Sequence, residues 1–285
     1  MTLGLVLSGG GVRGAAHIGV LKSLHEENIK PVLLSGTSAG SIVAGLYSYG
    51  YSPDEISLIA RQLTRKYYDI DYNGIISSIF HLLFTGSIST TGLLKGDMLE
   101  NMFSKLTKGT CMGEAKIPTA ITAVDINNAN IVIFTSFRAR LLQRKDYVYL
   151  FNRPFSEAIR SSIAIPGIFQ PKMIDSMRLV DGGVRDNLPV DIIRLMGARK
   201  VIAVNLAYGG NPVPEVDNIV EISLQAIQLM MYQINRCSLE AADIVISPKM
   251  EEVSHGDLSK IDSIIQSGYR ATKEMMPKIK RLLKY

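Results

Sequence analysis

The pentapeptide Gly36-Thr37-Ser38-Ala39-Gly40 constrains the fold of this chain more than any other stretch. It follows the apolar run 32–35 and precedes an apolar helical segment. A serine between two glycines at a strand-to-helix junction is typical of a nucleophile elbow, where the turn leaves no room for side chains two residues either side of the serine. The turn also places the hydroxyl near the positive end of the following helix. The pattern predicts Ser38 as a nucleophile, with Gly36 and Gly40 as turn residues.

A glycine-rich loop lies one strand-and-helix unit upstream. Its sequence is Gly9-Gly10-Gly11-Val12-Arg13-Gly14, after the apolar run 3–7. Successive glycines let backbone N–H groups converge on one point, which makes an anion site. In acyl transfer the anion is the oxygen of a tetrahedral intermediate, so the loop predicts an oxyanion hole. A nucleotide phosphate loop is the alternative, but the loop lacks the Gly-Lys-Ser/Thr ending of a P-loop and the downstream acidic residue of a dinucleotide site.

A third glycine turn carries a carboxylate. The sequence Asp181-Gly182-Gly183 follows the apolar run 177–180. Asp-Gly is also common in ordinary turns, which is the competing interpretation. Together, the three glycine-flanked sites supply a nucleophile, an oxyanion cradle and a base. We expect all three at the carboxyl ends of strands, where open α/β sheets bind their ligands.

These motifs, in this order, resemble the patatin-like phospholipase family, in particular its small bacterial members. A fourth stretch, 164–171, is similar to the family's proline-containing segment, and 187–189 fits as well. The resemblance runs from about residue 3 to 206 and implies a three-layer α/β/α fold with a mainly parallel sheet. It further implies a serine lipid acyl hydrolase that needs no cofactor and forms an acyl-enzyme. The implied residues are Ser38 as nucleophile, Asp181 as base, and Gly9, Gly10, Gly11, Arg13 and Gly14 around the oxyanion.

Three alternatives stay open at this point. Ser38, Asp181 and His255 follow the Ser–Asp–His order of α/β-hydrolases, and His255 lies in a polar stretch where catalytic histidines occur. The dyad is favoured because those hydrolases normally place the elbow deeper in the sheet. An acyltransferase or thioesterase would use the same dyad. A non-catalytic module would hold a lipid at the glycine loop without turnover.

Length and composition limit the class of protein that this chain can be. The chain has 285 residues, 47% of them hydrophobic, which predicts one α/β domain over 1–285 with the C-terminal helices packed on the motif-bearing part. Cys111 and Cys237 are expected to be free thiols. With four histidines and no close-spaced cluster, no metal site is expected. The chain shows neither a secretory signal nor an 18-residue apolar run, which favours a cytoplasmic protein.

The net charge of +5 would suit contact with anionic membrane surfaces. It would equally suit nucleic acid, but no recognised motif supports that partner. The sequence does not indicate an oligomeric state.

Short apolar runs alternate with helical segments along the chain, as in α/β proteins. Strands are predicted at 2–8, 31–35, 117–126, 130–136, 177–181, 200–206 and 243–247. Helices are predicted at 14–27, 39–49, 53–66, 95–107, 156–164, 189–197, 219–240 and 260–283. The second of the two runs near 117–136 fits the return arm of a hairpin, so we expect some antiparallel pairing.

Two segments leave more than one interpretation. Residues 67–95 form either a loop with a core helix or a mobile apolar cover over Ser38. The helix 260–283 is strongly amphipathic, with a basic end, and is expected to pack on the core or, less favoured, to dock on a membrane. Pro277 is expected to kink or interrupt it.

Overall fold

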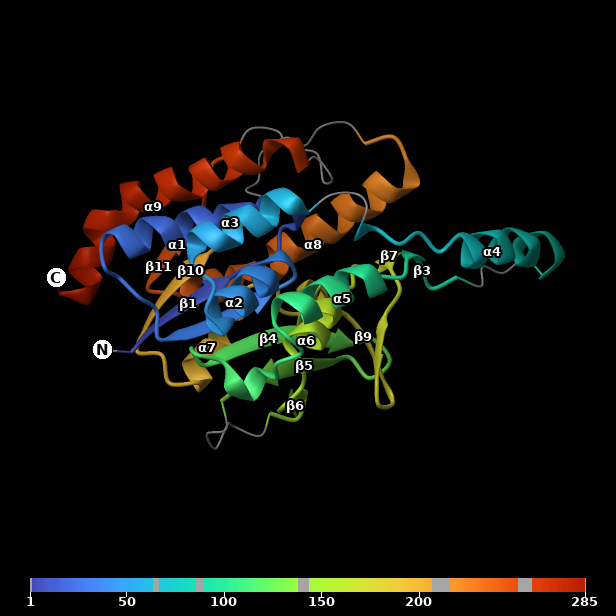
Figure 1. The fold of residues 1–285 in the computed structure, drawn as a ribbon, viewed down its shortest axis with the longest axis horizontal. Helices are drawn as coiled ribbons and strands as arrows, with labels where there is room; N and C mark the ends of the chain where they lie inside the picture. Colours follow the sequence, from blue (N-terminus) through green and yellow to red (C-terminus); the bar gives the residue numbers. More distant parts are fainter. Residues whose placement is uncertain are drawn as a thin grey trace.

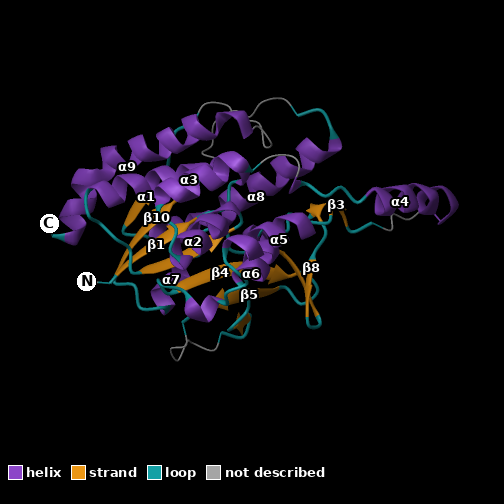
Figure 2. Cartoon of the chain, viewed as in Figure 1, coloured by secondary structure: helices purple, strands orange, loops and turns teal. Residues whose placement is uncertain are grey.

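A central β-sheet with helices on both faces forms the body of the molecule (Figures 1 and 2). The computed structural model describes residues 2–63, 67–85, 90–137, 144–206, 216–250 and 258–284. The strands are β1 (Leu3–Leu7), β2 (Leu33–Thr37), β3 (Gly92–Leu94), β4 (Thr119–Asp125), β5 (Asn130–Thr135), β6 (Tyr147–Leu150), β7 (Gly167–Phe169), β8 (Lys172–Ile174), β9 (Met177–Asp181), β10 (Lys200–Val204) and β11 (Ile244–Ile246). The α-helices are α1 (Ala16–Glu26), α2 (Ala39–Tyr49), α3 (Pro53–Gln62), α4 (Tyr72–Thr85), α5 (Asp97–Leu106), α6 (Phe155–Ser162), α7 (Val190–Leu195), α8 (Ile219–Ala241) and α9 (Ile261–Leu283).

The main sheet has the strand order β11-β10-β1-β2-β4-β5-β6, with β9 beside β4 and β8 beside β9. The pairs β11–β10, β10–β1, β1–β2, β2–β4 and β5–β6 are parallel. The pairs β4–β5, β4–β9 and β8–β9 are antiparallel. This confirms the predicted α/β class, its mainly parallel sheet and the hairpin, which is β4–β5.

The period of two along each strand distributes the core between the two faces of the sheet. Leu5 and Leu7 of β1 pack in one apolar cluster with α1, α2 and α9. Val6, between them, points to the opposite face, into a cluster that α7 covers. Strands buried on both faces read as continuous apolar runs, which is why the sequence revealed them.

Helices α1 and α9 pack with their backbones in close contact. A Cβ built on Gly268 of α9 would lie 2.0 Å from the carbonyl oxygen of Ala16, and one on Gly19 of α1 would lie 1.9 Å from that of Ile265. The C-terminal helix therefore seats on the motif-bearing part through two residues without side chains. It continues through Pro277 to its end without the predicted interruption.

Element boundaries differ from prediction in several places. The strand predicted at 31–35 is β2 at 33–37, so it continues directly to Ser38. The helix predicted at 53–66 ends at Gln62, although its capping box between Ser52 and Glu55 forms as expected. The helix predicted from residue 14 begins with a 3₁₀ turn, η1 (Gly11–Ala15). The short strands β3, β6, β7 and β8 were not predicted, because three or four half-buried residues give little periodicity.

Residues 67–95 match neither interpretation of the sequence. Instead of joining the core, α4 projects from the body beyond β3 and β7 (Figure 1). Tyr72, Ile76 and Leu82 on it are 65%, 53% and 51% exposed. Among the described residues, none from α4 lines the apolar cavity next to Ser38, so the helix does not cover that serine in this structure.

Candidate active site

Ser38 occupies the turn between β2 and α2 in a strained backbone conformation. Its φ is 52° and its ψ is −126°, which is unusual for a residue with a side chain. Its amide donates a hydrogen bond to the hydroxyl of Ser162, 2.8 Å away, and its carbonyl accepts bonds from the amide and hydroxyl of Ser41. These buried bonds stabilise the turn. They hold the serine at the N-terminus of α2 with its side chain free of any α2 capping bond.

The glycines around the turn provide the space that the sequence pattern predicts. A Cβ on Gly36 would lie 2.6 Å from the carbonyl oxygen of Gly40, and one on Gly40 would lie 2.1 Å from that of Leu7. One on Gly14 would meet the Cβ of Ala39 at 2.4 Å. The turn, the end of β1 and the glycine loop therefore pack backbone to backbone, which no larger residue permits.

Asp181 reaches Ser38 through an arrangement that the sequence did not predict. Along one edge of β4, Thr37 of β2 pairs with Thr122, and Asp181 of β9 pairs with the next residue, Ala123. Strand β2 is parallel to β4 and β9 is antiparallel, so the two strands run toward each other and end at the same point. Asp181 is the last residue of β9, so it lies at the carboxyl end of a strand as expected, but that strand is antiparallel to β4. It is brought to the serine from the opposite direction.

The surroundings of Asp181 change its acidity. The side chain is fully buried, and burial raises its pKa from the usual 3.8 to about 6. The Ser38 hydroxyl and the Gly183 amide, which donates to Oδ1 over 2.8 Å, partly oppose that rise. Oδ2 has no hydrogen-bond partner that meets ordinary distance and angle limits among the described residues. A carboxylate with a pKa near 6 is a better proton acceptor at neutral pH than an ordinary aspartate.

Gly182 and Gly183 let the chain turn closely after Asp181. A Cβ on Gly182 would lie 2.5 Å from the carbonyl oxygen of Thr122. One on Gly183 would meet the Met231 side chain at 2.2 Å. The amide of Asp181 donates to the carbonyl of Ala164, so the proline-containing stretch 164–171 is tied to the same site.

The glycine loop presents only part of its backbone to a ligand. The amide of Gly9 already donates to the backbone and side-chain oxygens of Asn187, and the amide of Arg13 donates to Gly10. Among the described residues, none accepts a hydrogen bond from the amides of Gly10 and Gly11. Those two N–H groups are therefore available as donors, and so is the amide of Val12. Gly9 contributes space instead, since its Cβ would lie 3.0 Å from that of Ser38.

Four buried polar residues support this arrangement, and none of them was predicted to have this role. His17 bonds the carbonyl of Ser8 through Nε2 at 2.8 Å, and burial lowers its pKa to about 4, so the neutral ring donates. The Ser8 hydroxyl donates to Gly9 and accepts from the amide of Leu206. Asn187 and Ser162 hold the glycine loop and the elbow. Of the four, Asn187 had a signal in the sequence, because it lies in the stretch 187–189 that resembles the family. The other three had none beyond their proximity to the motifs.

An apolar cavity of about 220 Å³ opens next to Ser38. Of the described residues that line it, only Ser38 and Tyr68 have polar side chains. The remainder come chiefly from the glycine loop, α2, α3, α5 and the segment 163–169. Such a cavity excludes water and favours a hydrocarbon ligand.

Three further expectations concern His255, a metal site and the two cysteines. His255, the third member of the alternative triad, lies outside the described residues. Within the described part of the chain, no three His, Cys, Asp or Glu side chains are grouped so as to hold a metal ion. The two cysteines carry no disulfide, and Cys237 is exposed.

Comparison with known sequences gives one consistent result. The model of the family described as patatin-like phospholipase matches residues 5–194. The chain is 31% identical over 204 residues to lysophospholipase NTE1 of Candida albicans, covering 72% of this chain and 13% of that protein. It is 33% identical over 202 residues to an uncharacterized NTE family protein of Mycobacterium bovis, covering 71% of this chain and 48% of that protein. The chain thus spans less than half the length of these relatives.

Solved structures show the same fold at low identity. VipD from Legionella pneumophila superimposes with a TM-score of 0.53 at 12% identity, covering 97% of this chain and 67% of that one. The type III effector protein ExoU superimposes with a TM-score of 0.50 at 12% identity, covering 97% of this chain and 53% of that one.

Proposed function

Because this chain belongs to the patatin-like phospholipase family, we propose that it is a serine lipid acyl hydrolase that cleaves carboxyl esters of lipids. One observation carries the proposal. A serine in a strained elbow faces an apolar cavity and lies beside a fully buried aspartate whose pKa is raised to about 6. That combination supplies a nucleophile, a base and a place for an acyl chain.

The chemistry follows from these positions. Ser38 Oγ attacks the ester carbonyl carbon while its proton passes to Asp181, forming a tetrahedral intermediate. The amides of Gly10 and Gly11 stabilise its oxyanion, each donor being worth roughly 3–4 kcal/mol in such sites. The bond from the carbonyl carbon to the alkoxide oxygen then breaks, and Asp181 returns the proton to that oxygen. The alcohol leaves, and the acyl group stays on Ser38 Oγ as the acyl-enzyme. Asp181 then takes a proton from a water molecule, whose oxygen attacks the acyl-enzyme. As the fatty acid leaves, Asp181 passes that proton to Ser38 Oγ, which restores the serine and the carboxylate.

The cavity indicates which part of the substrate the protein encloses. Its lining carries no charged side chain among the described residues, so it suits an acyl chain and not a phosphate head group. The head group would therefore stay outside, toward solvent. The name of the Candida albicans relative, lysophospholipase, makes a lysophospholipid the first substrate to test.

The direct test combines product analysis with covalent labelling. We expect the purified chain to release free fatty acid from a lysophospholipid, and a fluorophosphonate probe to modify the peptide that contains Ser38. Preincubation with the probe is expected to stop fatty-acid release. Failure of the probe to label Ser38 in the folded protein would leave the non-catalytic lipid-binding module as the better account. Diversion of the acyl group to an added alcohol at low acceptor concentration would favour an acyltransferase.

The raised pKa of Asp181 predicts the pH dependence of the reaction. The base must be ionised to accept a proton, so kcat/KM for a short-chain ester is expected to rise with pH up to about 6 and to level off above it. Below that point the rate should fall about tenfold per pH unit. A profile that stays flat from pH 5 to pH 8 contradicts the role of this carboxylate. A histidine base would give a similar curve, so the same profile is measured with His255→Ala, which is expected to leave it unchanged.

A further inference from the structure

Helix α4 combines an uncharged composition with exposure at the surface. Its fourteen residues, Tyr72–Thr85, include no Asp, Glu, Lys or Arg, whereas 20% of the whole chain is charged. It projects away from the body (Figure 1), and Tyr72, Ile76 and Leu82 are all more than half exposed. A helix this apolar is ordinarily buried, so its exposed surface requires a covering partner.

The length of α4 limits what that partner is. Fourteen residues make a helix of about 21 Å, which is shorter than the roughly 30 Å hydrocarbon core of a bilayer. Over the described residues, the helices include none with the length and hydropathy needed to cross a membrane. A helix of this size and composition can lie within one leaflet, with its backbone hydrogen bonds satisfied internally.

The base of the arm adjoins the cavity next to Ser38. Tyr68, just before α4, lines that cavity and is still 38% exposed. Ile70, the next apolar residue, is also exposed. Apolar surface therefore runs from the cavity to α4, and tyrosines at its base suit the boundary between hydrocarbon and water.

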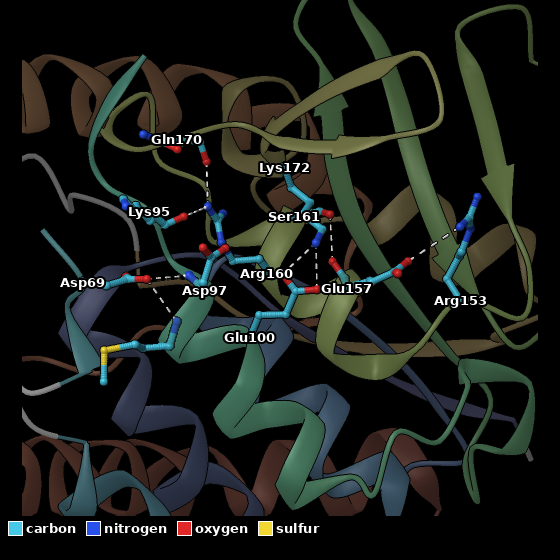
Figure 3. Close-up of polar contacts among 11 residues, drawn as sticks. Asp69, Lys95, Asp97, Glu100, Arg153, Glu157, Arg160, Ser161, Gln170 and Lys172 are labelled. Atoms are coloured by element: carbon cyan, nitrogen blue, oxygen red, sulfur yellow. Dashed lines mark hydrogen bonds and ion pairs between the residues drawn. The ribbon is translucent and has the colours of Figure 1, made fainter. Parts of the chain in front are cut away.

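A set of polar contacts fixes the two ends of the arm to the body (Figure 3). Asp69 accepts hydrogen bonds from the amides of Gly96, Asp97 and Met98, at the start of α5. The buried guanidinium of Arg160 donates to the carbonyls of Lys95 and Gln170. These bonds join the segment before α4, the segment after it and the stretch that carries the cavity wall.

Two strands complete this anchor. Leu94 of β3 pairs with Phe169 of β7, which lines the cavity. The side chain of Gln170 donates to Asp71 over 2.7 Å. The arm is thus held at a defined position relative to the cavity, as a docking element must be.

We propose that α4 is a docking arm that inserts into a lipid surface and holds the mouth of the cavity against it, an inference that rests on the proposed lipid substrate. A lipid surface fits better than a second copy of the chain. Protein interfaces carry a polar rim with paired hydrogen bonds, whereas hydrocarbon accepts an uncharged helix without matched partners. Since the arm has no cations, its insertion depends on buried apolar area and not on anionic lipid.

The basic end of α9 is the alternative membrane contact, and the structure disfavours it. That end lies near the C-terminus, at the opposite side of the body from α4 (Figure 1). Lys273 and Lys280 on it already form ion pairs with Glu26 and Glu27. Docking through that end of α9 would turn the arm away from the lipid.

The test measures binding to phosphatidylcholine vesicles by flotation, in the Ser38→Ala background so that no lipid is consumed. We expect Ser38→Ala to bind, and Ser38→Ala/Ile76→Gln/Leu82→Gln to bind about tenfold more weakly or worse, because two inserted apolar side chains are lost. Ser38→Ala/Val32→Gln is the matched control. Val32 is 47% exposed, but it lies just before β2, at the amino ends of the strands, and its variant is expected to bind normally. Raising the salt from 50 to 500 mM is expected to leave binding unchanged.

Several results would overturn the proposal. These are normal binding by the arm variant, release of the protein by salt, or no binding by Ser38→Ala itself. Light scattering that shows a dimer converted to a monomer by the two arm substitutions would assign α4 to a second copy instead. Thermal unfolding checks that each variant is folded. Wild-type turnover of a soluble short-chain ester is measured separately, so a failure of the hydrolase assignment is distinguishable from a failure of docking.

Discussion

Replacing Ser38 with alanine is expected to lower ester hydrolysis by about 10³-fold or more, and Asp181→Asn nearly as far. Ser38→Ala removes the atom that bonds to the acyl group. Asp181→Asn keeps the shape of the side chain, but its amide cannot accept the serine proton. The measurement is kcat/KM for a medium-chain chromogenic ester, with each variant shown to be folded by circular dichroism.

The control for this prediction is His255→Ala. A dyad requires that this variant retain activity near that of the wild type. Comparable losses in the Ser38, Asp181 and His255 variants would instead indicate a triad. Similar activity of Asp181→Asn and the wild type would remove Asp181 from the mechanism, whatever its position beside Ser38.

Asp181→Asn is expected to lose activity but to gain stability at high pH, so its stability provides a second readout. Because the folded protein raises the pKa of Asp181, the protonated carboxyl favours the folded state. That contribution is fully present below the unfolded pKa of 3.8 and is lost as the pH rises through about 6. The difference between the two pKa values corresponds to roughly 3 kcal/mol of folding free energy that is lost at high pH. A neutral amide of the same shape does not ionise and avoids that loss. At pH 8 the inactive Asp181→Asn is therefore expected to unfold at a higher urea concentration than the wild type.

Gly268→Ala is expected to destabilise the fold by roughly 2–4 kcal/mol, although alanine has a higher helix propensity than glycine. In an exposed helix this change would stabilise by about 1 kcal/mol. Here the new Cβ would lie 2.0 Å from the carbonyl oxygen of Ala16, so α1 and α9 must move apart. The apolar faces that these helices bury against each other would then lose contact.

Urea unfolding followed by circular dichroism measures the effect, and Gln266→Ala on the exposed face of α9 is its control. That control is expected to change the free energy of unfolding by only a few tenths of a kcal/mol. Gly19→Ala should reproduce the loss from the other helix, because its Cβ would lie 1.9 Å from the carbonyl oxygen of Ile265. A neutral or stabilising Gly268→Ala would mean that the two helices do not pack backbone to backbone.

The sequence predicted those features whose causes are local. A buried strand, a glycine-flanked serine and an apolar helix occupy consecutive residues at 32–49, so the elbow is visible without knowing any distant contact. The same holds for the glycine loop at 9–14 and for the capping box at Ser52. The α/β class followed because strands buried on both faces need continuous apolar runs. The order of motifs along the chain identified the family that the comparisons then confirmed.

Tertiary structure alone decided how these parts meet. Ser38 and Asp181 come together because β2 and β9 approach each other along β4, and strand direction is a long-range property that leaves no mark on either strand. The amide of Gly9 is unavailable because Asn187, 178 residues later, already accepts from it. For α4, an apolar run predicts burial but not what buries it, so the chain alone could not show that the helix leaves the body. Local patterns thus determined the chemical groups and the fold class, and the packing of distant segments determined their geometry.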